Sequence, residues 1–142
     1  MAEHEKQILW AGFNDLTIDH YVARLAQTGV KTSKAYNYLE SEKKIRQQRF
    51  DIIIAQSAMS PGCFELYDDP NNPHKHSMTF VYHVRITPPN VNTPVLVVYP
   101  QRLHEGVLED FVHFGAKECL DLQEMVKKGP QVFVDKVKSY LK

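Results

Sequence analysis

Asp51-Ile52-Ile53-Ile54-Ala55 is the most informative segment of the chain. Its β-branched residues run without polar alternation, which is typical of a strand that is buried on both faces of a parallel sheet. Apolar runs of the same kind occur at residues 8–11 and, after Pro94, at residues 95–98. We therefore expect these three segments to form the centre of a parallel sheet.

Helices are predicted between these strands. After the first strand, apolar residues recur at helical spacing at Ile18, Tyr21, Val22 and Leu25. Asn14 or Asp15 can cap the start of this helix, and Gly29 provides a left-handed stop. The pattern predicts one amphipathic helix that packs against the sheet.

A capping box marks the next helix. Residues 30–33 predict a short strand, and Asn37 followed three residues later by Glu40 predicts a helix through about Gln48. We interpret the charged positions of this helix as a solvated face rather than a docking patch. These positions are Glu42, Lys43, Lys44, Arg46 and Gln47.

The second half of the chain continues the alternation. A helix that ends before Gly115 is predicted from Leu103, Val107, Leu108 and Phe111. Residues 119–122 predict a fifth strand, and Pro130 begins a last helix with Phe133, Val137, Tyr140 and Leu141 facing inward. The fold class is therefore α/β, with a doubly wound five-stranded parallel sheet flanked by helices on both faces.

The segment between the third and fourth strands carries conflicting signals. Residues 63–76 contain a strong loop signal and resemble an insert. From Met78 to Ile86 apolar residues alternate, which locally favours a strand. We nevertheless expect a helix, capped by Ser77, because parallel neighbouring strands are normally joined through a helical crossover.

Length and charge narrow the classes of function. The 142 residues suit one domain, and 17 basic residues balance 17 acidic ones. We expect no nucleic-acid partner, because no net positive charge would attract the phosphate backbone. Without a long apolar run or a signal peptide, we expect a cytoplasmic protein with no membrane contact. Cys63 and Cys119 are interpreted as free thiols.

The order of these segments resembles the receiver domain of two-component response regulators, a flavodoxin-like three-layer sandwich. The resemblance covers residues 7–141 and rests on five motifs together with their spacing. These are Gln7-Ile-Leu-Trp-Ala, Asp51-Ile-Ile-Ile-Ala, Met59 with Pro61-Gly62, Thr93-Pro-Val-Leu-Val-Val and Gly115-Ala-Lys-Glu-Cys-Leu.

Receivers of that family hold Mg²⁺ with two acidic residues after the first strand, and an aspartate after the third strand accepts a phosphoryl group. The acidic pair corresponds here to Gly12 and Phe13, and the acceptor to Gln56 or Ser57. The hydroxyl after the fourth strand corresponds to Tyr99, and the lysine after the fifth to Leu122. The resemblance therefore implies a degenerate pseudo-receiver that is not an enzyme and holds no metal or cofactor.

Two alternatives stay open at this point. If the first strand ran through Phe13, Asn14 and Asp15 could occupy the acidic corner. The other alternative is a small-molecule or metal sensor that reuses the vacated pocket with the histidines of the insert region. Those histidines are His74, His76 and His83, whose spacing matches no zinc signature. A solvated polar loop is the interpretation that we prefer for them.

The resemblance also implies a surface for protein binding. By analogy with the family's usual output surface, we expect a docking face for a signalling protein or for self-association at Tyr99, Leu103, Phe111, Glu118, Cys119 and Leu120. Trp10, Phe13 and Tyr99 fall near the strand ends that would frame the acidic pocket. We interpret these aromatic residues as filling the space of the lost carboxylates; the alternative is a permanently switched surface.

Overall fold

The computed structural model describes residues 5–13, 18–62, 72–100 and 102–141. Its sheet has five parallel strands, as the sequence predicted, and their order is β2-β1-β3-β4-β5. The strands are β1 (Gln7–Ala11), β2 (Lys31–Ala35), β3 (Ile52–Gln56), β4 (Val95–Tyr99) and β5 (Glu118–Asp121). The fifth strand thus begins and ends one residue earlier than expected.

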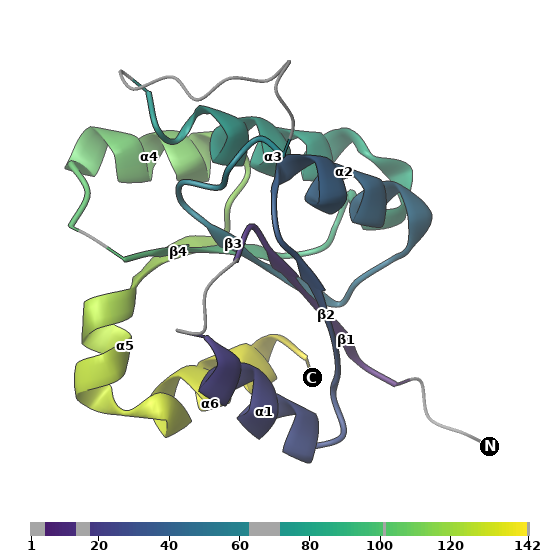
Figure 1. Cartoon of the computed structure of the whole chain (residues 1–142), viewed down its shortest axis with the longest axis vertical. Helices are drawn as coiled ribbons and strands as arrows, with labels where there is room; N and C mark the ends of the chain where they lie inside the picture. The colour runs from purple at the N-terminus through teal and green to yellow at the C-terminus, as the bar shows by residue number, and fades with distance from the viewer. Residues whose placement is uncertain (1–4, 14–17, 63–71, 101, 142) are drawn as a thin grey trace.

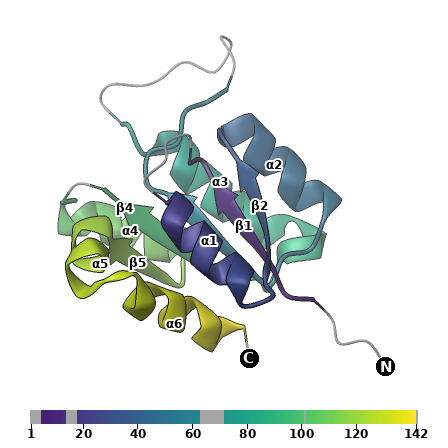
Figure 2. The same ribbon diagram turned by 60° about the horizontal axis from the view of Figure 1, so that its bottom comes forward.

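Two layers of helices cover the sheet (Figure 1). One face carries α1 (Asp19–Gln27), α5 (Leu122–Lys128) and α6 (Pro130–Tyr140). The other carries α2 (Tyr38–Gln47), α3 (Lys75–Ile86) and α4 (Glu105–Phe114). Turned by 60°, the molecule shows α1 and α6 side by side (Figure 2), where they contact one another. In the described parts of the chain, no helix is long and apolar enough to cross a membrane.

Each central strand contributes to two hydrophobic cores. Ile52 and Ile54 belong to the cluster under α1, α5 and α6, whereas Ile53 belongs to the cluster under α2, α3 and α4. Successive side chains of a strand point to opposite faces, so a sheet covered on both sides needs apolar residues at every position. This explains the apolar runs from which the fold was predicted.

The crossover after β3 is helical, which confirms the prediction made from topology. The helix α3 begins at Lys75, before the expected cap at Ser77. The cap prediction was wrong, because Ser77 lies inside the helix and is buried. Its hydroxyl accepts a hydrogen bond from the backbone N–H of Met59 at 2.8 Å, so Ser77 holds the loop that follows β3.

The capping box of α2 is present. The Asn37 side chain accepts a hydrogen bond from the backbone N–H of Glu40 at 2.9 Å. The solvated interpretation was wrong for Glu42, which is only 5% exposed. Its carboxylate faces α3 and contacts Nδ1 of His83 at 2.5 Å, so α2 and α3 meet through a polar pair. The prediction of a cap at Asn14 or Asp15 was wrong, because α1 begins at Asp19 and Ile18 is at its N-cap position; Asn14 and Asp15 themselves lie outside the described residues.

One helix was not predicted. The seven residues of α5 follow β5 directly, and the Asp121 side chain caps them by accepting a hydrogen bond from the backbone N–H of Gln123 at 2.8 Å. The helix stops at Gly129, and α6 begins with Pro130 as expected. The segment was missed because helical periodicity is recognised over about 11 to 18 residues, and α5 is shorter than that.

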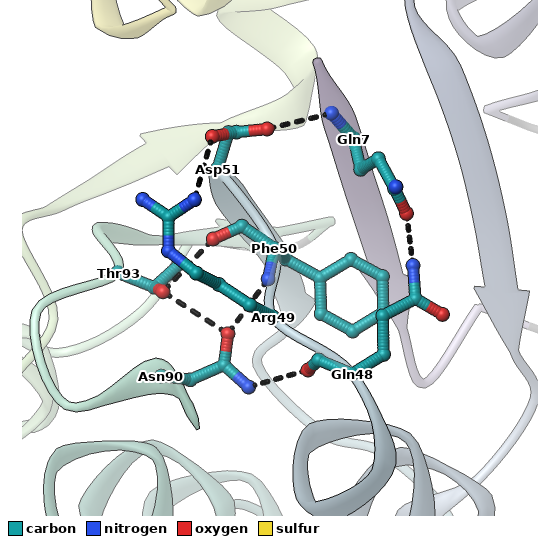
Figure 3. A network of polar contacts seen from close by, with 7 residues as sticks. All are labelled: Gln7, Gln48, Arg49, Phe50, Asp51, Asn90 and Thr93. Carbon is teal, nitrogen blue, oxygen red and sulfur yellow. Dashed lines mark hydrogen bonds and ion pairs between the residues drawn. The ribbon is translucent and has the colours of Figure 1, made fainter. Parts of the chain in front are cut away.

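A polar network lies at the amino-terminal edge of the sheet (Figure 3). The Asn90 side chain accepts a hydrogen bond from the N–H of Phe50 at 2.8 Å and donates one to the carbonyl of Gln48 at 2.8 Å. The Thr93 hydroxyl donates to the carbonyl of Phe50 at 2.9 Å. Asp51 accepts a hydrogen bond from the N–H of Gln7 at 2.8 Å. The network fixes where β3 begins.

Candidate functional site

The carboxyl-terminal edge of the sheet is where open α/β folds bind ligands. Ala11 pairs with Ala55, and Gln56 pairs with Val98, so the residues that follow β1 and β3 come out at the same edge. Tyr99 pairs with Asp121 at the ends of β4 and β5. The structure therefore gathers the predicted site positions along one edge, with Leu122 one residue further on, at the start of α5.

Gly12 decides what this edge can hold. It adopts a φ of +84°, a conformation that L side chains rarely adopt. A Cβ built on Gly12 would lie 2.5 Å from Cβ of Met59, which is a steric clash. Met59 is only 2% exposed and packs in the core under α2, α3 and α4. The space beside the end of β1 is therefore occupied by a methionine, and no side chain fits at position 12.

Phe13 turns away from the edge and into the opposite core. Its ring makes an edge-to-face contact with Trp10, with ring centroids 5.8 Å apart, and both residues are buried. Trp10 also contacts the ring of Phe133 in α6. Trp10 and Phe13 therefore fill this core and not the space of the lost carboxylates, so that interpretation was wrong for both; Met59 occupies the space beside Gly12. Tyr99, the third aromatic residue of that prediction, is half-buried at the end of β4.

Three hydrogen bonds fix the position of the loop after β3. The N–H of Ser57 donates to the carbonyl of Val98 at 3.0 Å, and Nδ1 of His74 donates to the carbonyl of Ser57 at 2.9 Å. The hydrogen bond from Met59 to Ser77 completes the set. Ser57 itself is 1% exposed, whereas Gln56 is half-buried. Of the two candidate acceptor positions, only the amide of Gln56 approaches the surface.

Asp121 places a carboxylate at the carboxyl-terminal end of β5, beside Tyr99. It is engaged as the cap of α5, where it accepts hydrogen bonds from the N–H groups of Gln123 and Glu124. Burial raises the pKa of the neighbouring Tyr99 hydroxyl, and the charge of Asp121 adds to this shift. Leu122, at the position expected for a lysine, packs against the core under α1 and α6.

The three histidines of the insert region do not converge. His74 binds the Ser57 carbonyl, the ring of His76 lies 5.3 Å from that of Tyr38, and His83 contacts Glu42. Each therefore has its own packing role. The interpretation as a solvated polar loop was wrong, because His76 and His83 lie within α3 and His76 is buried. No group of three metal-binding side chains occurs within residues 5–13, 18–62, 72–100 and 102–141.

The predicted docking face needs one correction. Phe111 is fully buried in the core under α4 and cannot touch a partner. Glu118, Cys119 and Leu120 are half-buried along β5, and Leu103 is half-buried before α4. Burial raises the pKa of the Cys119 thiol to about 11, so this thiol is un-ionised at neutral pH.

Several residues that shape the site were not predicted from sequence. Met59 was noted only as part of a motif, and the roles of His74 and Ser77 depend on contacts between segments far apart in the chain. Asp121 could have been found, because an aspartate two residues before Gln123-Glu124 is a helix-capping signal.

Comparisons with known proteins agree with this geometry. No family model matches the sequence, and no curated protein matches it. Among solved structures, a signal receiver domain of a two-component histidine kinase from Clostridium thermocellum has a TM-score of 0.73 at 14% identity, covering 98% of this chain and 99% of the other. The chain has the receiver fold.

A putative response regulator from Chloroflexus aurantiacus gives a TM-score of 0.72 at 21% identity, with 97% of this chain and 98% of the other covered. A two-component response regulator from Clostridium difficile gives 0.72 at 16% identity, with 96% of both chains covered. At these identities the comparisons establish the receiver fold and leave function to the residues of the site.

Proposed function

We propose that this chain is a receiver-fold signalling module of the cytoplasm that acts by binding another protein, independently of aspartyl phosphorylation. The observation that carries the proposal is the occupation of the Gly12 position by Met59. A receiver that is phosphorylated needs acidic side chains at this corner to hold a divalent cation. Here the backbone conformation of Gly12 and the packing of Met59 both oppose any side chain.

The acceptor positions support the same conclusion. Phosphoryl transfer to a protein needs an accessible nucleophile, and a carboxylate is the nucleophile in an acyl phosphate. Gln56 offers an amide, which is not a nucleophile of this kind. Ser57 offers a hydroxyl, but the residue is almost completely buried. Among the described residues, the chain therefore keeps the scaffold while the expected acceptor positions carry no carboxylate and position 12 has no room for an acidic side chain.

The docking face of the proposal runs from the end of β4 to β5 and consists of Tyr99, Leu103, Glu118, Cys119 and Leu120. Its side chains are half-buried, and Phe111 supports the adjoining helix from beneath. Glu118 is held in place by Lys136 at 2.6 Å and by the hydroxyl of Tyr140. A fixed, partly apolar surface of this kind suits a protein partner better than a phosphate or a nucleic acid.

The small-molecule alternative loses its main support, because the corner that was expected to be vacant is filled by Met59. Three hollows in the described structure lie elsewhere. One of about 430 Å³ is at the amino-terminal edge near Arg49 and Pro88, one of about 290 Å³ is beside β5 and α6, and one of about 600 Å³ is near Arg85 and Lys117. None of these three includes Gly12, Phe13, Gln56 or Ser57.

Thermal unfolding tests the proposal. A ligand that binds only the folded state raises the unfolding midpoint. We expect the same midpoint in buffer, with Mg²⁺, and with Mg²⁺ plus acetyl phosphate. A rise of several degrees that requires both Mg²⁺ and acetyl phosphate would contradict the proposal. In that case the Asp15→Asn variant would show whether Asp15 holds the cation, because the rise would then be lost.

A further inference from the structure

The neutral chain distributes its charges unevenly between two helices. An exposed stripe of α2 consists of Leu39, Lys43 and Arg46, and one of α4 consists of Glu105, Glu109 and Val112. Both stripes have the spacing i, i+4, i+7, which places their members on one side of a helix. We refer to them as the α2 stripe and the α4 stripe.

Both stripes combine charge with an exposed apolar residue. Leu39 is 41% exposed and Val112 is 52% exposed. Lys43, Glu105 and Glu109 form no ion pair with other described residues, and Arg46 contacts Glu42 only at 3.4 Å while its side chain stays 61% exposed. The stripes are therefore available, and their charges are opposite.

The two stripes complement one another in one orientation only. With a rise of about 1.5 Å per residue, each stripe spans about 10 Å. Placed antiparallel, α2 sets Leu39 against Val112, Lys43 against Glu109 and Arg46 against Glu105, with an offset of about 1.5 Å at the middle pair. A parallel arrangement would instead set Leu39 against Glu105 and Arg46 against Val112. The antiparallel arrangement thus gives two ion pairs and one apolar contact.

A single molecule cannot make these contacts, because α3 lies between α2 and α4 in the same helical layer (Figure 1). We propose that a second copy of this chain docks its α2 stripe antiparallel onto the α4 stripe of the first. The two surfaces differ, so the contact is heterologous and leaves one free stripe on each end of the pair. The assembly grows head to tail rather than closing as a twofold dimer.

The association is weak and electrostatic. Exposed ion pairs contribute little, and a contact of this size falls below that of a stable interface, so the dissociation constant is on the order of 1 mM. Salt screens charges of this kind, with a Debye length of about 30 Å at 0.01 M and about 3 Å at 1 M. Self-association is therefore a low-salt property that grows with protein concentration.

Sedimentation velocity on the full chain provides the test. At low salt and millimolar concentration we expect the weight-average sedimentation coefficient to rise with concentration, and to return to the monomer value at high salt. Lys43→Glu and Glu109→Lys should each abolish the rise, because each places like charges opposite one another. The matched control Lys138→Glu, on the exposed side of α6, should leave it unchanged.

The decisive variant combines both charge reversals in one chain. K43E/E109K restores opposite charges across the head-to-tail contact, so we expect low-salt association to return. Contacts between two α2 stripes or two α4 stripes would not be restored by this swap. A wild-type chain that stays monomeric at low salt, a single variant that still associates, or a double variant that stays monomeric would each overturn the proposal. Circular dichroism of each variant verifies that the fold is retained.

Discussion

The two edges of the sheet differ in what they bury. At the amino-terminal edge, Asn90 and Thr93 are buried polar residues whose hydrogen bonds fix the start of β3. At the carboxyl-terminal edge, where receivers carry out phosphoryl chemistry, the buried apolar residue Met59 closes the corner beside Gly12, and Phe13 packs into the core under α1, α5 and α6. The described buried polar residues of the carboxyl-terminal edge, Ser57 and Ser77, hold the loop after β3 and supply no carboxylate.

A buried polar residue in such a chain can serve either the fold or a functional site, and its contacts distinguish the two roles. A buried amide with its hydrogen bonds satisfied serves the fold, because leaving its partners unpaired is costly. Gly12 has a positive φ and packs against Met59, so an acidic side chain would have no room at this position. The location of a residue within the fold, together with its contacts, therefore says more than its chemical type.

Asn90→Ala should have the largest effect on stability. It leaves the N–H of Phe50 without its acceptor and removes donors from the carbonyls of Ile45 and Gln48. We expect a loss of about 3 kcal/mol in the free energy of unfolding. Urea denaturation measures it. The exposed Asn92→Ala should change stability by less than about 0.5 kcal/mol, and equal losses in both variants would contradict the structural role of Asn90.

Cys119 tests the apolar surroundings of β5. Since its thiol pKa is about 11 and the ordinary value is 9.0, alkylation of the native protein near pH 8 should be slower than that of the unfolded chain by about 100-fold. The Cys63→Ser variant leaves one thiol, so the rate of iodoacetamide labelling reports Cys119 alone. Equal rates with and without denaturant would show that the thiol is solvated.

Gly12→Ala measures how tightly the carboxyl-terminal edge is closed. The new Cβ suffers both the strained φ and the clash with Met59, for which we expect a loss of about 2 kcal/mol or more. Gly29 is the matched control, because it has a φ of +87° and no atom within 4 Å of a built Cβ. Gly29→Ala should cost about 1 kcal/mol from strain alone. If both variants lost the same amount in chemical denaturation, the edge would be open.

Tyr38 gives the smallest effect, on its interaction with Glu42 within α2. Burial, the charge of Glu42 and a hydrogen bond to Glu42 raise the pKa of Tyr38 from 10.0 to about 12. The folded protein therefore holds the phenolic proton more tightly than the unfolded chain. The stabilisation is complete below pH 10 and is lost as the pH rises toward 12.

The comparison of wild type with Tyr38→Phe isolates this contribution. We expect the variant to be less stable by about 1 kcal/mol at neutral pH, with the difference shrinking above pH 10. Urea denaturation at a series of pH values measures the difference, and tyrosinate absorbance follows the titration. Tyr36→Phe serves as control because Tyr36 is exposed. A difference that grows with pH would contradict the contact.

The fold was largely predictable because the apolar runs of residues 52–55 and 95–98 report burial directly. At α3 two signals competed, since alternation from Met78 favoured a strand while topology required a helix, and topology prevailed. Capping by Asn37 was also readable, because it depends on residues close together in the chain. The missed α5 shows the limit of periodicity in a segment of seven residues.

The site was less predictable than the fold. The sequence identified which positions lack carboxylates, but it could not show that Met59 fills the corner, because this depends on contacts between β1 and the loop after β3. Likewise, the burial of Glu42 follows from its contact with α3 and not from its residue type. Contacts between distant segments decided each of these cases.

Intact-mass spectrometry after incubation with Mg²⁺ and acetyl phosphate tests the central claim most directly. A phosphorylatable receiver from another protein serves as positive control under the same conditions. The account predicts that the mass of this chain stays unchanged while the control gains one phosphoryl group. A phosphoryl adduct on this chain that is lost on treatment with hydroxylamine, as expected of an acyl phosphate, would contradict it.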